Sequence, residues 1–575
     1  MTDWQTCCQT WLKSPLLEEE ERRQIQRMTE EERQTFFSAP LAFGTAGLRG
    51  ETAPGPGGVN RFTIAQAALA FGQFLLETQP EARQKGVCLC GDARRNSREF
   101  VQIAAEALSS LGLLVFLFPE PRPTPELSFA VRRLGAAGGM NITASHNPRQ
   151  FNGCKLYRHT GAQLTDEECA QVAQKMAVLP LLRPLPQGDA AQIRPLNQTT
   201  DQDYLDAVAQ ECCPEEQTLP WRGRLTIVYT PLHGVGGLLL PQLLRSQGFT
   251  NLHCVEAQMA PDGNFPTAPA PNPEHPPAFA LALELARQVR ADLVVATDPD
   301  ADRVAFAALR QGEYQILSGH QAGCLLAEHL FSARCRTETL PENPFLVKSL
   351  VTTQLAEKVA RFYGGQTLDT FTGFKHMANL AQDWEDKGRG QCILAFEEAI
   401  GAMVGGHCRD KDGLAAALAL CHLAAQCLSQ GLSLWDKLEQ LYQTHGFYLE
   451  DAFSLTFQGP EAQAHMAAAM DRLRTQPPAS LGGLPLLEIQ DYLPGIALDI
   501  AANCTKPLCL SGANMVYYKA AGGDLAVRPS GTEPKIKCYL LAQGQSRSQA
   551  EERLSALRQA APALLDQRTP KEKWI

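Results

Sequence analysis

The sequence predicts an α/β protein made of several doubly wound domains, with an α+β domain at its C-terminal end. Three observations carry this prediction. A chain of 575 residues is too long for a single hydrophobic core and should divide into domains. From Val87 onward, short apolar runs alternate with helix-favouring segments, which is the βαβ order of mostly parallel sheets with helices on both faces. From Phe453 onward that alternation stops.

Two segments precede the first predicted sheet. Residues 18–33 are strongly charged and favour a helix, for which a solvated face is the simplest interpretation. The segment FGTAGLRG at residues 43–50 is a glycine-rich turn that carries Arg49. Its glycines allow backbone N–H groups to approach a phosphate, but no Gly-Lys-Ser/Thr follows, so the turn is not an ATP-binding P-loop.

Three rounds of strand and helix follow. In the first round Ser97 is predicted to cap a helix, and Pro125 lies in the first turn of another. The expected strands are 87–90, 113–118 and 138–142, then 225–229, 251–255 and 293–297, then 345–350, 366–369 and 391–396. The expected helices are 97–110, one that opens at 124, 235–246, 277–290 and one that ends at 362. The α+β domain has expected strands at 453–457, 524–527 and 536–541 and a helix at 461–474.

Composition excludes several classes of function. The net charge is −10, so nonspecific attraction to nucleic acid or to an anionic membrane is not expected, and an anionic substrate needs local basic groups. No basic region followed by an apolar one marks a signal peptide, and the longest apolar run, near 111–118, is too short to cross a bilayer. The eighteen cysteines are scattered and form no spaced CxxC pairs, which predicts buried, reduced thiols in a cytoplasmic protein.

The segment GVGG at residues 234–237 imitates a dinucleotide-binding fingerprint. Glu256 closes the next predicted strand, as an acidic residue does in that motif. The third glycine is missing, however, because Leu239 occupies its position. We therefore expect no nicotinamide or flavin cofactor.

The first of four polar loops is TASHNP at residues 143–148, which follows strand 138–142. Pro148 prevents a helix there, so Ser145 should lie on a loop at the end of the strand. A serine on a loop is usually a turn residue whose hydroxyl binds its own backbone. Here, however, His146 is adjacent and Lys155 lies just downstream, and a serine can carry a phosphoryl group as an ester.

The second loop is TDPDADR at residues 297–303, after strand 293–297. Its three aspartates, Asp298, Asp300 and Asp302, alternate and are expected to converge on one side of an extended segment. Carboxylates packed together repel one another unless a hard cation neutralises them, and Mg²⁺ suits an all-oxygen site. An EF-hand is excluded because Arg303 and Leu309 stand where that motif requires Gly and Glu.

The third loop is FEEAIG at residues 396–401. Glu397 and Glu398 follow a strand, and carboxylates at such a position accept hydrogen bonds from sugar hydroxyls, although solvated surface acids remain an alternative. The preceding strand end carries Thr372, Gly373 and Lys375, which add a cation.

The fourth loop is RPSGTEPK at residues 528–535. One turn combines an arginine, two hydroxyls, a glycine and a lysine, which is the composition of a phosphate-binding nest. A plain turn leaves the two cations unexplained. The contributing residues are Arg528, Ser530, Gly531, Thr532 and Lys535. Together the four loops offer a serine that can carry a phosphoryl group, a metal site, carboxylates that recognise sugar hydroxyls, and a phosphate-binding loop, here called the phosphate clamp. This combination indicates phosphoryl transfer on a phosphorylated sugar.

These loops resemble the motifs of the α-D-phosphohexomutase superfamily. The matches are the serine loop, DPDADR at 298–303, TGFK at 372–375 and RPSGTEP at 528–534, in the family's order. Within the superfamily the chain is most similar to the branch of bacterial α-phosphoglucomutases and phosphopentomutases, through FGTAGLR at 43–49, TPLHG at 230–234 and RDKDG at 409–413.

The resemblance implies a heart-shaped monomer of four domains, three doubly wound mixed α/β domains plus a C-terminal α+β domain. The expected boundaries are 1–205 with the phosphoserine loop, 206–325 with the metal loop, 326–448 with the sugar loop and 449–575 with the phosphate loop. It also implies a small phosphosugar substrate and a trace of sugar 1,6-bisphosphate, or a pentose bisphosphate, as activator.

The resemblance further implies a role for each loop. Ser145 would be phosphorylated, and its phosphate would ligate Mg²⁺ together with the three aspartates. The transferring group would be surrounded by Arg49, Lys155 and Arg303, with His146 beside the serine. The fourth loop would bind the phosphate that is not transferred. His407, just before RDKDG, would assist proton transfer, with a surface histidine as the alternative.

One departure leaves the substrate open. Phosphoglucomutases typically carry Glu-x-Ser in the sugar loop, whereas this chain has Ala399 in place of the serine. Glucose 1-phosphate to glucose 6-phosphate is the main expectation, and ribose 1-phosphate to ribose 5-phosphate is the alternative. A glucose 1,6-bisphosphate synthase, a phosphatase and a noncatalytic phosphosugar-binding relative are further alternatives.

Overall fold

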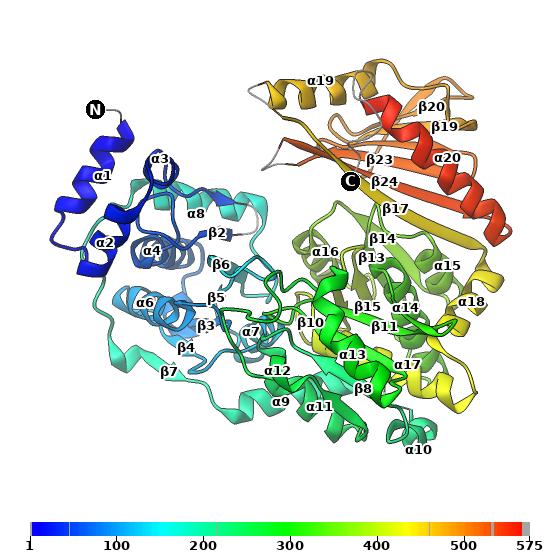
Figure 1. Cartoon of the computed structure of the whole chain (residues 1–575), viewed down its shortest axis with the longest axis horizontal. Helices are drawn as coiled ribbons and strands as arrows, with labels where there is room; N and C mark the ends of the chain where they lie inside the picture. The colour runs from blue at the N-terminus through cyan, green and yellow to red at the C-terminus, as the bar shows by residue number, and fades with distance from the viewer. Residues whose placement is uncertain (1–2, 45–46, 214, 459–460, 531–533, 566–575) are drawn as a thin grey trace. The chain divides into compact units, whose positions relative to one another are not determined.

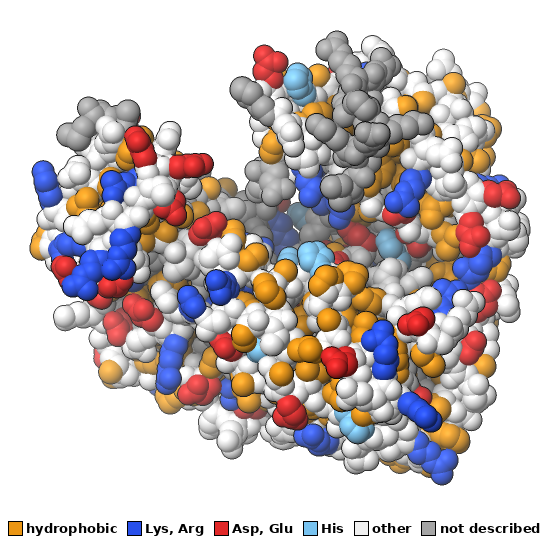
Figure 2. Space-filling view, in the orientation of Figure 1, with side chains coloured by type: hydrophobic (Ala, Val, Ile, Leu, Met, Phe, Trp, Pro, Cys, Tyr) orange, Lys and Arg blue, Asp and Glu red, His pale blue; other side chains and the backbone are white. Residues whose placement is uncertain are grey.

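The computed structural model describes residues 3–44, 47–213, 215–458, 461–530 and 534–565 (Figure 1). Its contacts divide the chain into two compact units. The first comprises Met1–Val347 and Phe374–Trp435, and the second comprises Lys348–Gly373 and Asp436–Ile575. On the face shown in Figure 2, lysine and arginine side chains are interspersed with aspartate and glutamate side chains.

Three helices precede the first sheet: α1 (Asp3–Lys13), α2 (Glu19–Arg27) and α3 (Glu30–Phe37). They pack around Trp11, whose ring meets the rings of Phe37 and Phe62 edge-on at centroid distances of 6.0 and 5.6 Å. The charged segment 18–33 is therefore helical as predicted. It forms two helices because Thr29 caps the start of α3, accepting a hydrogen bond from the Glu32 N–H.

The first sheet has the strand order β1-β2-β6-β5-β3-β4-β7. The strands β5, β3, β4 and β7 run parallel, whereas β6, β2 and β1 are antiparallel additions. The expectation of a mostly parallel sheet is thus wrong for this half, because the short connection between β5 and β6 allows only an antiparallel return. The strands are β1 (Phe43–Gly44), β2 (Gly47–Glu51), β3 (Val87–Gly91), β4 (Val115–Leu117), β5 (Gly138–Ile142), β6 (Phe151–Arg158) and β7 (Ile193–Pro195).

Helices cover both faces of this sheet, which confirms the doubly wound prediction. Helices α4, α6 and α8 share one apolar core with the strands, and α7 shares the other. Ser97 was predicted to cap α6, but it is the first residue of that helix, and Asn96 occupies the cap position. The Ser97 hydroxyl instead donates to Asp92. The helices are α4 (Arg61–Thr78), α5 (Ala82–Lys85), α6 (Ser97–Ser110), α7 (Thr124–Leu134), α8 (Asp166–Val178) and the 3₁₀ helix η1 (Ala190–Gln192).

The second sheet has the order β12-β11-β10-β8-β9, with β10, β8 and β9 parallel and the other two antiparallel. The strands are β8 (Ile227–Thr230), β9 (Leu252–Cys254), β10 (Leu293–Thr297), β11 (Val304–Arg310) and β12 (Glu313–Ile316). The associated helices are α9 (Gln198–Glu211), η2 (Glu216–Thr218), α10 (Leu219–Arg222), α11 (Gly236–Ser246), α12 (Glu256–Met259), η3 (Pro276–Phe279), α13 (Ala280–Val289) and α14 (Gly319–Arg336). The single helix expected at 277–290 is thus a 3₁₀ turn followed by α13.

Four strands form the third sheet, in which β15 pairs antiparallel with β16. The strands are β13 (Pro344–Ser349), β14 (Gln366–Thr370), β15 (Gln391–Phe396) and β16 (Ala402–Val404). The helices are α15 (Leu355–Phe362), α16 (Phe374–Asp386), α17 (Gly413–Ser429) and α18 (Leu434–His445). In the described part of the chain no single helix is long and apolar enough to cross a membrane, and α17 and α18 pass that test only as a pair, with a break and a bend between them.

The C-terminal sheet has the antiparallel order β17-β24-β23-β22-β19-β20-β21, and β18 pairs with β19. Helices α19 (Ala462–Thr475) and α20 (Arg547–Leu565) share its core, and α20 lies across the sheet in Figure 1. This confirms the predicted α+β domain. The strands are β17 (Phe447–Thr456), β18 (Ser480–Leu481), β19 (Leu484–Asp491), β20 (Ile496–Asp499), β21 (Cys504–Pro507), β22 (Val516–Ala520), β23 (Gly523–Pro529) and β24 (Lys535–Gly544).

The predicted fold class is therefore confirmed, with three α/β domains and a C-terminal sheet domain. The boundaries at residues 205, 325 and 448 stay predictions. All eighteen cysteines are free thiols, and most are buried; Cys335, Cys504 and Cys509 are the exposed ones.

Candidate functional site

Ser145 lies on the loop that leaves β5, as predicted. The residue is only 3% exposed, and its φ of +53° is in the left-handed region that costs a non-glycine residue steric strain. Its backbone N–H donates to Thr143 Oγ1 at 2.8 Å, and the Thr143 hydroxyl donates to Asp92 Oδ2 at 2.7 Å. A strained backbone at a buried serine is thus held in place by a side-chain network.

Arg94 also holds this loop in place. Its guanidinium donates to four backbone carbonyls of the loop, two of them, Pro148 and Phe151, at 2.9 Å; the other two belong to Ser145 and Asn147. Asp92 neutralises it at 3.2 Å. Sequence reasoning missed both residues. The available signal was their position at the carboxyl end of β3, which runs parallel to β5, so that both strand ends meet at one edge of the sheet.

Asp298, Asp300 and Asp302 are all buried, and their carboxylate oxygens lie within 4.8 Å of one another. The expected extended segment is wrong: the backbone turns, with Ala301 at φ +54° and its N–H bonded to the Asp298 carbonyl. The turn brings the three carboxylates together because it curls the chain around one point. The Arg303 N–H donates to Asp298 Oδ1 at 3.0 Å and fixes the turn.

The structure brings the serine, the lysine and the aspartates together, although up to 157 positions separate them (302 − 145). The Ser145 hydroxyl lies 3.1 Å from Asp298 Oδ2. Lys155, on β6, places its Nζ atom 2.8 Å from both Asp300 and Asp302. From α7, the Thr124 hydroxyl donates to Asp300 at 2.7 Å.

The donor set of this cluster fits a divalent cation. Within the described residues, Asp300 Oδ1 and Asp302 Oδ1 are buried oxygens that no hydrogen-bond donor reaches. A buried acceptor without a partner costs about 1–3 kcal/mol. Burial, followed by the charges of Asp300 and Asp302, raises the pKa of Asp298 well above its ordinary value. Hard carboxylate oxygens pointing at one another are the ligands that Mg²⁺ prefers.

Lys411 also reaches the cluster, which sequence reasoning missed even though it recognised RDKDG. Its Nζ atom lies 3.1 Å from Asp302 and 5.0 Å from the centre of the Phe374 ring. Although burial works against it, the ammonium groups of Lys155 and Lys411 hold the pKa of Asp302 well below its usual range. Two lysines from different domains thus keep this carboxylate ionised.

The predicted cations and histidine lie around this cluster. Arg49, on β2, approaches Asn147 Oδ1 at 3.4 Å; burial lowers the pKa of Arg49, and Asp300 opposes that shift. Arg303 is paired with Glu274 at 3.5 Å. Nδ1 of His146 lies 3.2 Å from the Ser145 hydroxyl. Burial, and then the charge of Arg303, lowers the pKa of His146 to about 3, so the imidazole beside the serine is neutral.

The predicted sugar loop follows β15 in a turn, in which the Glu397 N–H donates to the Gly401 carbonyl. Burial raises the pKa of Glu397 to about 7, with Lys411 opposing the shift. Glu398 is half-buried beside it. Lys375, in the first turn of α16, is paired with Asp166. Thr372 and Gly373 form the turn before α16, and Gly373 adopts φ +112° there.

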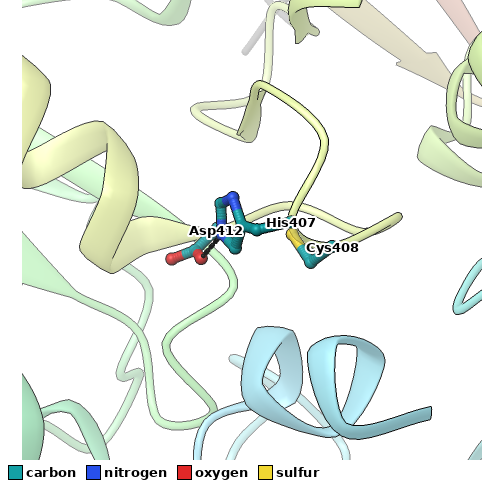
Figure 3. A group of neighbouring side chains, drawn as sticks. All are labelled: His407, Cys408 and Asp412. Carbon is teal, nitrogen blue, oxygen red and sulfur yellow. Dashed lines mark hydrogen bonds and ion pairs between the residues drawn. The ribbon is translucent and has the colours of Figure 1, made fainter. Parts of the chain in front are cut away.

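His407 is paired with a different aspartate (Figure 3). Its Nε2 atom lies 2.7 Å from Asp412 Oδ2, an oxygen that also accepts from the Tyr204 hydroxyl at 2.9 Å. The other oxygen of Asp412 caps α17 by accepting from the Leu414 and Ala415 N–H groups. The imidazole is buried in this network, so the contacts of His407 are with Asp412 and Tyr204, and its predicted proton-transfer role stays a prediction.

The predicted phosphate clamp belongs to the second compact unit, at the hairpin between β23 and β24. Arg528 donates through Nε to the Tyr539 hydroxyl at 3.2 Å. The Ser530 N–H donates to the Lys535 carbonyl at 2.7 Å and narrows the hairpin. Gly531 and Thr532 lie outside the described residues.

Comparison with known proteins matches three family models to the α/β domains. They are described as phosphoglucomutase/phosphomannomutase, alpha/beta/alpha domains I, II and III, and they match residues 40–179, 202–311 and 318–445. A phosphoglucomutase of Staphylococcus aureus (strain MRSA252) is 34% identical over 514 residues, which cover 88% of this chain and 91% of that one.

Solved structures have the same fold. A putative phosphomannomutase from Thermus thermophilus is 25% identical, with a TM-score of 0.68, and the match covers 92% of this chain and 99% of that one. The open form of parafusin from Paramecium, at 17% identity, has a TM-score of 0.67, with 93% and 97% covered.

Proposed function

The chain belongs to the phosphoglucomutase/phosphomannomutase family of the α-D-phosphohexomutase superfamily and is an isomerase that acts as an intramolecular phosphotransferase; we propose that it interconverts glucose 1-phosphate and glucose 6-phosphate through a phosphorylated Ser145. The observation that carries the proposal is the buried cluster in which the Ser145 hydroxyl lies 3.1 Å from Asp298 and Lys155 lies 2.8 Å from Asp300 and Asp302.

In the proposed cycle, phosphorylated Ser145 gives its phosphoryl group to the free hydroxyl of the sugar monophosphate. The O–P bond to serine breaks as a new O–P bond to the sugar forms, a base of the site takes the sugar hydroxyl proton, and the leaving Ser145 oxygen takes up a proton to become a hydroxyl again. The bisphosphate then turns over and returns its other phosphoryl group to Ser145. A sugar 1,6-bisphosphate in trace amount would phosphorylate the serine at the start.

The chain's own residues support this chemistry in distinct ways. Arg94 and the Asp92–Thr143 network hold the serine loop rigid, so that the reacting oxygen is positioned before substrate binds. The cationic side chains of Arg49, Lys155 and Arg303 are placed to stabilise charge on the transferring group. Asp298, Asp300 and Asp302 would hold Mg²⁺, which when bound supplies positive charge that polarises the phosphoryl oxygens.

Recognition of the sugar is assigned to the remaining loops. Glu397 and Glu398 would accept hydrogen bonds from sugar hydroxyls, with Thr372, Gly373, Lys375 and His407 as further substrate-binding residues. Arg528, Ser530 and Lys535, with Gly531 and Thr532, would bind the phosphate that is not transferred.

Ala399 favours a second candidate, the interconversion of ribose 1-phosphate and ribose 5-phosphate, because the hydroxyl that phosphoglucomutases typically offer at this point is missing. The deciding experiment compares kcat/KM for glucose 1-phosphate and ribose 1-phosphate with the same enzyme. A clear glucose preference supports the main proposal, and a strong ribose preference replaces the substrate while leaving the mechanism in place.

The mechanism has its own test. Ser145→Ala should abolish isomerisation of either substrate, and substantial residual turnover would refute a phosphoserine mechanism. Free phosphate, or an accumulating bisphosphate, in the wild-type reaction with glucose 1-phosphate would instead identify a phosphatase or a bisphosphate synthase.

A further inference from the structure

A polar cavity lies in the first compact unit, apart from the Ser145 cluster. Its volume is about 600 Å³. The polar side chains that line it come from α7, from the last turn of α9, from the end of α16 and from the loop between β16 and α17. They include Arg132, Gln210, Glu211, Glu385, His407 and Arg409.

The two acidic side chains of this cavity are already neutralised. Glu211 pairs with Arg334 at 3.0 Å, and it accepts from the Gly406 N–H at 3.0 Å. Glu385 pairs with Arg409 and accepts from the Cys392 N–H at 2.9 Å. Glu211 is thus balanced by Arg334 and Glu385 by Arg409, and neither carboxylate is left to balance the charge of Arg132.

The positive charge of Arg132 has no acidic partner among the described residues. Its contacts use Nη1 alone, which donates to the Thr160 carbonyl at 2.7 Å and to Gln382 Oε1 at 2.9 Å. Arg409 Nε donates to the same Gln382 oxygen at 2.9 Å, so two guanidinium groups share one neutral acceptor. Burial, and then repulsion from Arg409, lowers the pKa of Arg132 to about 10.

His407 lines the same wall, and Asp412 is its ion-pair partner. Although burial opposes it, Cys408 and then the hydrogen-bonded Asp412 hold the pKa of His407 well above its ordinary value, so the ring is an imidazolium. Its Nε2–H is used by Asp412, whereas Nδ1 is buried and finds no partner in the described part of the chain. Asp412, 2.7 Å away, supplies the counter-charge of this ring, so the pair adds no net charge to the cavity.

We propose that this cavity is a binding site for a small phosphate-class oxyanion, held by Arg132, with the guanidinium group of Arg409 beside it. Guanidinium groups bind such anions through charge-assisted, often bidentate, hydrogen bonds, and the amide of Gln210 offers a neutral donor at the rim. The shared chemistry is a dianionic phosphate, whether free or as the ester of a small metabolite. The site is distinct from the Ser145 cluster, and of its polar lining residues only His407 also belongs to the proposed substrate-binding set.

The position of the cavity connects it with the catalytic cluster. Its wall contains Arg409, and two residues further along the same loop Lys411 reaches Asp302 at 3.1 Å. Because Arg132 and Arg409 donate to the same Gln382 oxygen, an anion bound by Arg132 restrains the loop that carries Lys411. The proposed ligand can therefore change the position of Lys411 beside Asp302 without binding in the Ser145 cluster itself.

The test is hydrogen–deuterium exchange of the full chain, read by mass spectrometry, with inorganic phosphate as the probe and glucose 6-phosphate in a parallel arm. Phosphate should slow exchange in α7 and in residues 405–412. Arg132→Gln should abolish that protection or raise the half-saturating phosphate concentration at least about tenfold, as expected for the loss of about 1.4 kcal/mol. If inorganic phosphate protects these segments and glucose 6-phosphate does not, the ligand is free phosphate. If both compounds protect them, the site also binds the phosphate group of an ester.

Two variants keep the result interpretable. Arg133→Gln is the matched control, because Arg133 is the neighbouring arginine, is mostly exposed and pairs with Asp203 at 3.4 Å; protection should persist in it. If Arg132→Gln fails to fold, Ala207→Glu adds a negative charge to the cavity wall without removing a cation, and it should also abolish protection. Protection confined to residues 143–155 and 298–303, or protection unchanged in both cavity variants, would overturn the site whatever the mutase assays show.

Discussion

Two clusters in the first compact unit look equally suited to a metal ion by proximity, yet they differ in kind. In both the aspartate triplet and the group of His407, Cys408 and Asp412, the candidate ligand atoms lie within 4.8 Å of one another. In the triplet, two buried carboxylate oxygens find no donor in the described chain. In the second cluster, both oxygens of Asp412 are occupied. One accepts from His407 (Figure 3) and from Tyr204, and the other accepts from the N–H groups at the start of α17.

The comparison teaches that unsatisfied lone pairs, not closeness, distinguish a metal site from a structural cluster. A carboxylate that already accepts four hydrogen bonds has no free lone pair with which to bind a cation, and its role is to hold the surrounding residues in place. We therefore expect the triplet to govern activity and Asp412 to govern stability. The following predictions separate the two, beginning with the largest effect.

Asp300→Asn should lower kcat/KM on the order of 10³-fold, because it removes one charge from the proposed metal site without changing its shape. Titration calorimetry should show that Mg²⁺ binding is lost or greatly weakened. Asp412→Asn is the matched control and should retain Mg²⁺ affinity. Wild-type Mg²⁺ affinity in Asp300→Asn would contradict the assignment of the triplet.

Arg94→Lys should lower kcat by about 100-fold with little change in KM, because an ammonium group cannot reach all four loop carbonyls and the left-handed Ser145 would shift. Steady-state kinetics would measure the effect. Arg95→Lys, at an exposed neighbour that bonds Asn264, should leave kcat unchanged. If both variants have the wild-type kcat, Arg94 is not a positioning residue.

Asp412→Asn should destabilise the fold by about 3 kcal/mol, because the buried imidazolium of His407 loses its counter-charge. Differential scanning calorimetry would detect this as a lower Tm. Asn still accepts hydrogen bonds at the start of α17, so the loss reports the ion pair and not the cap. An unchanged Tm would mean that Asp412 contributes no net stability through His407.

The smallest expected effect is a difference between the wild type and His407→Gln in how the free energy of unfolding depends on pH. The folded pKa of His407 lies above its ordinary value near 6.5, so its stabilisation is complete below pH 6.5 and is lost as pH rises through the folded pKa. Wild-type stability should therefore fall by up to about 1.4 kcal/mol per pH unit above pH 6.5 through this group, a slope absent from the variant. The measurement is the Tm of the wild type and of His407→Gln at pH 6, 7 and 8. If the Tm of both proteins changes equally with pH, His407 is not protonated in the folded protein.

The strands and the motif loops could be predicted from the sequence because each depends on neighbouring residues. The strand before Ser145, the Pro148 stop, the strand before Asp298 and the loss of alternation after Phe453 all follow from local apolar patterns and turn chemistry, and the structure has them. The antiparallel strand β6 was not predicted. Its sequence is too mixed to indicate a strand, and only pairing with β5 and β2 makes it one.

What the sequence alone determined is therefore the set of chemical groups and the short segments that present them. Only the tertiary structure decided that Lys411 reaches Asp302, that Arg94 binds the Ser145 loop and that His407 is bound to Asp412. Those facts depend on which residues meet in space and on how deeply they are buried. Distances between side chains far apart along the chain, and the loss of water around them, are set by packing and leave no local trace in the sequence.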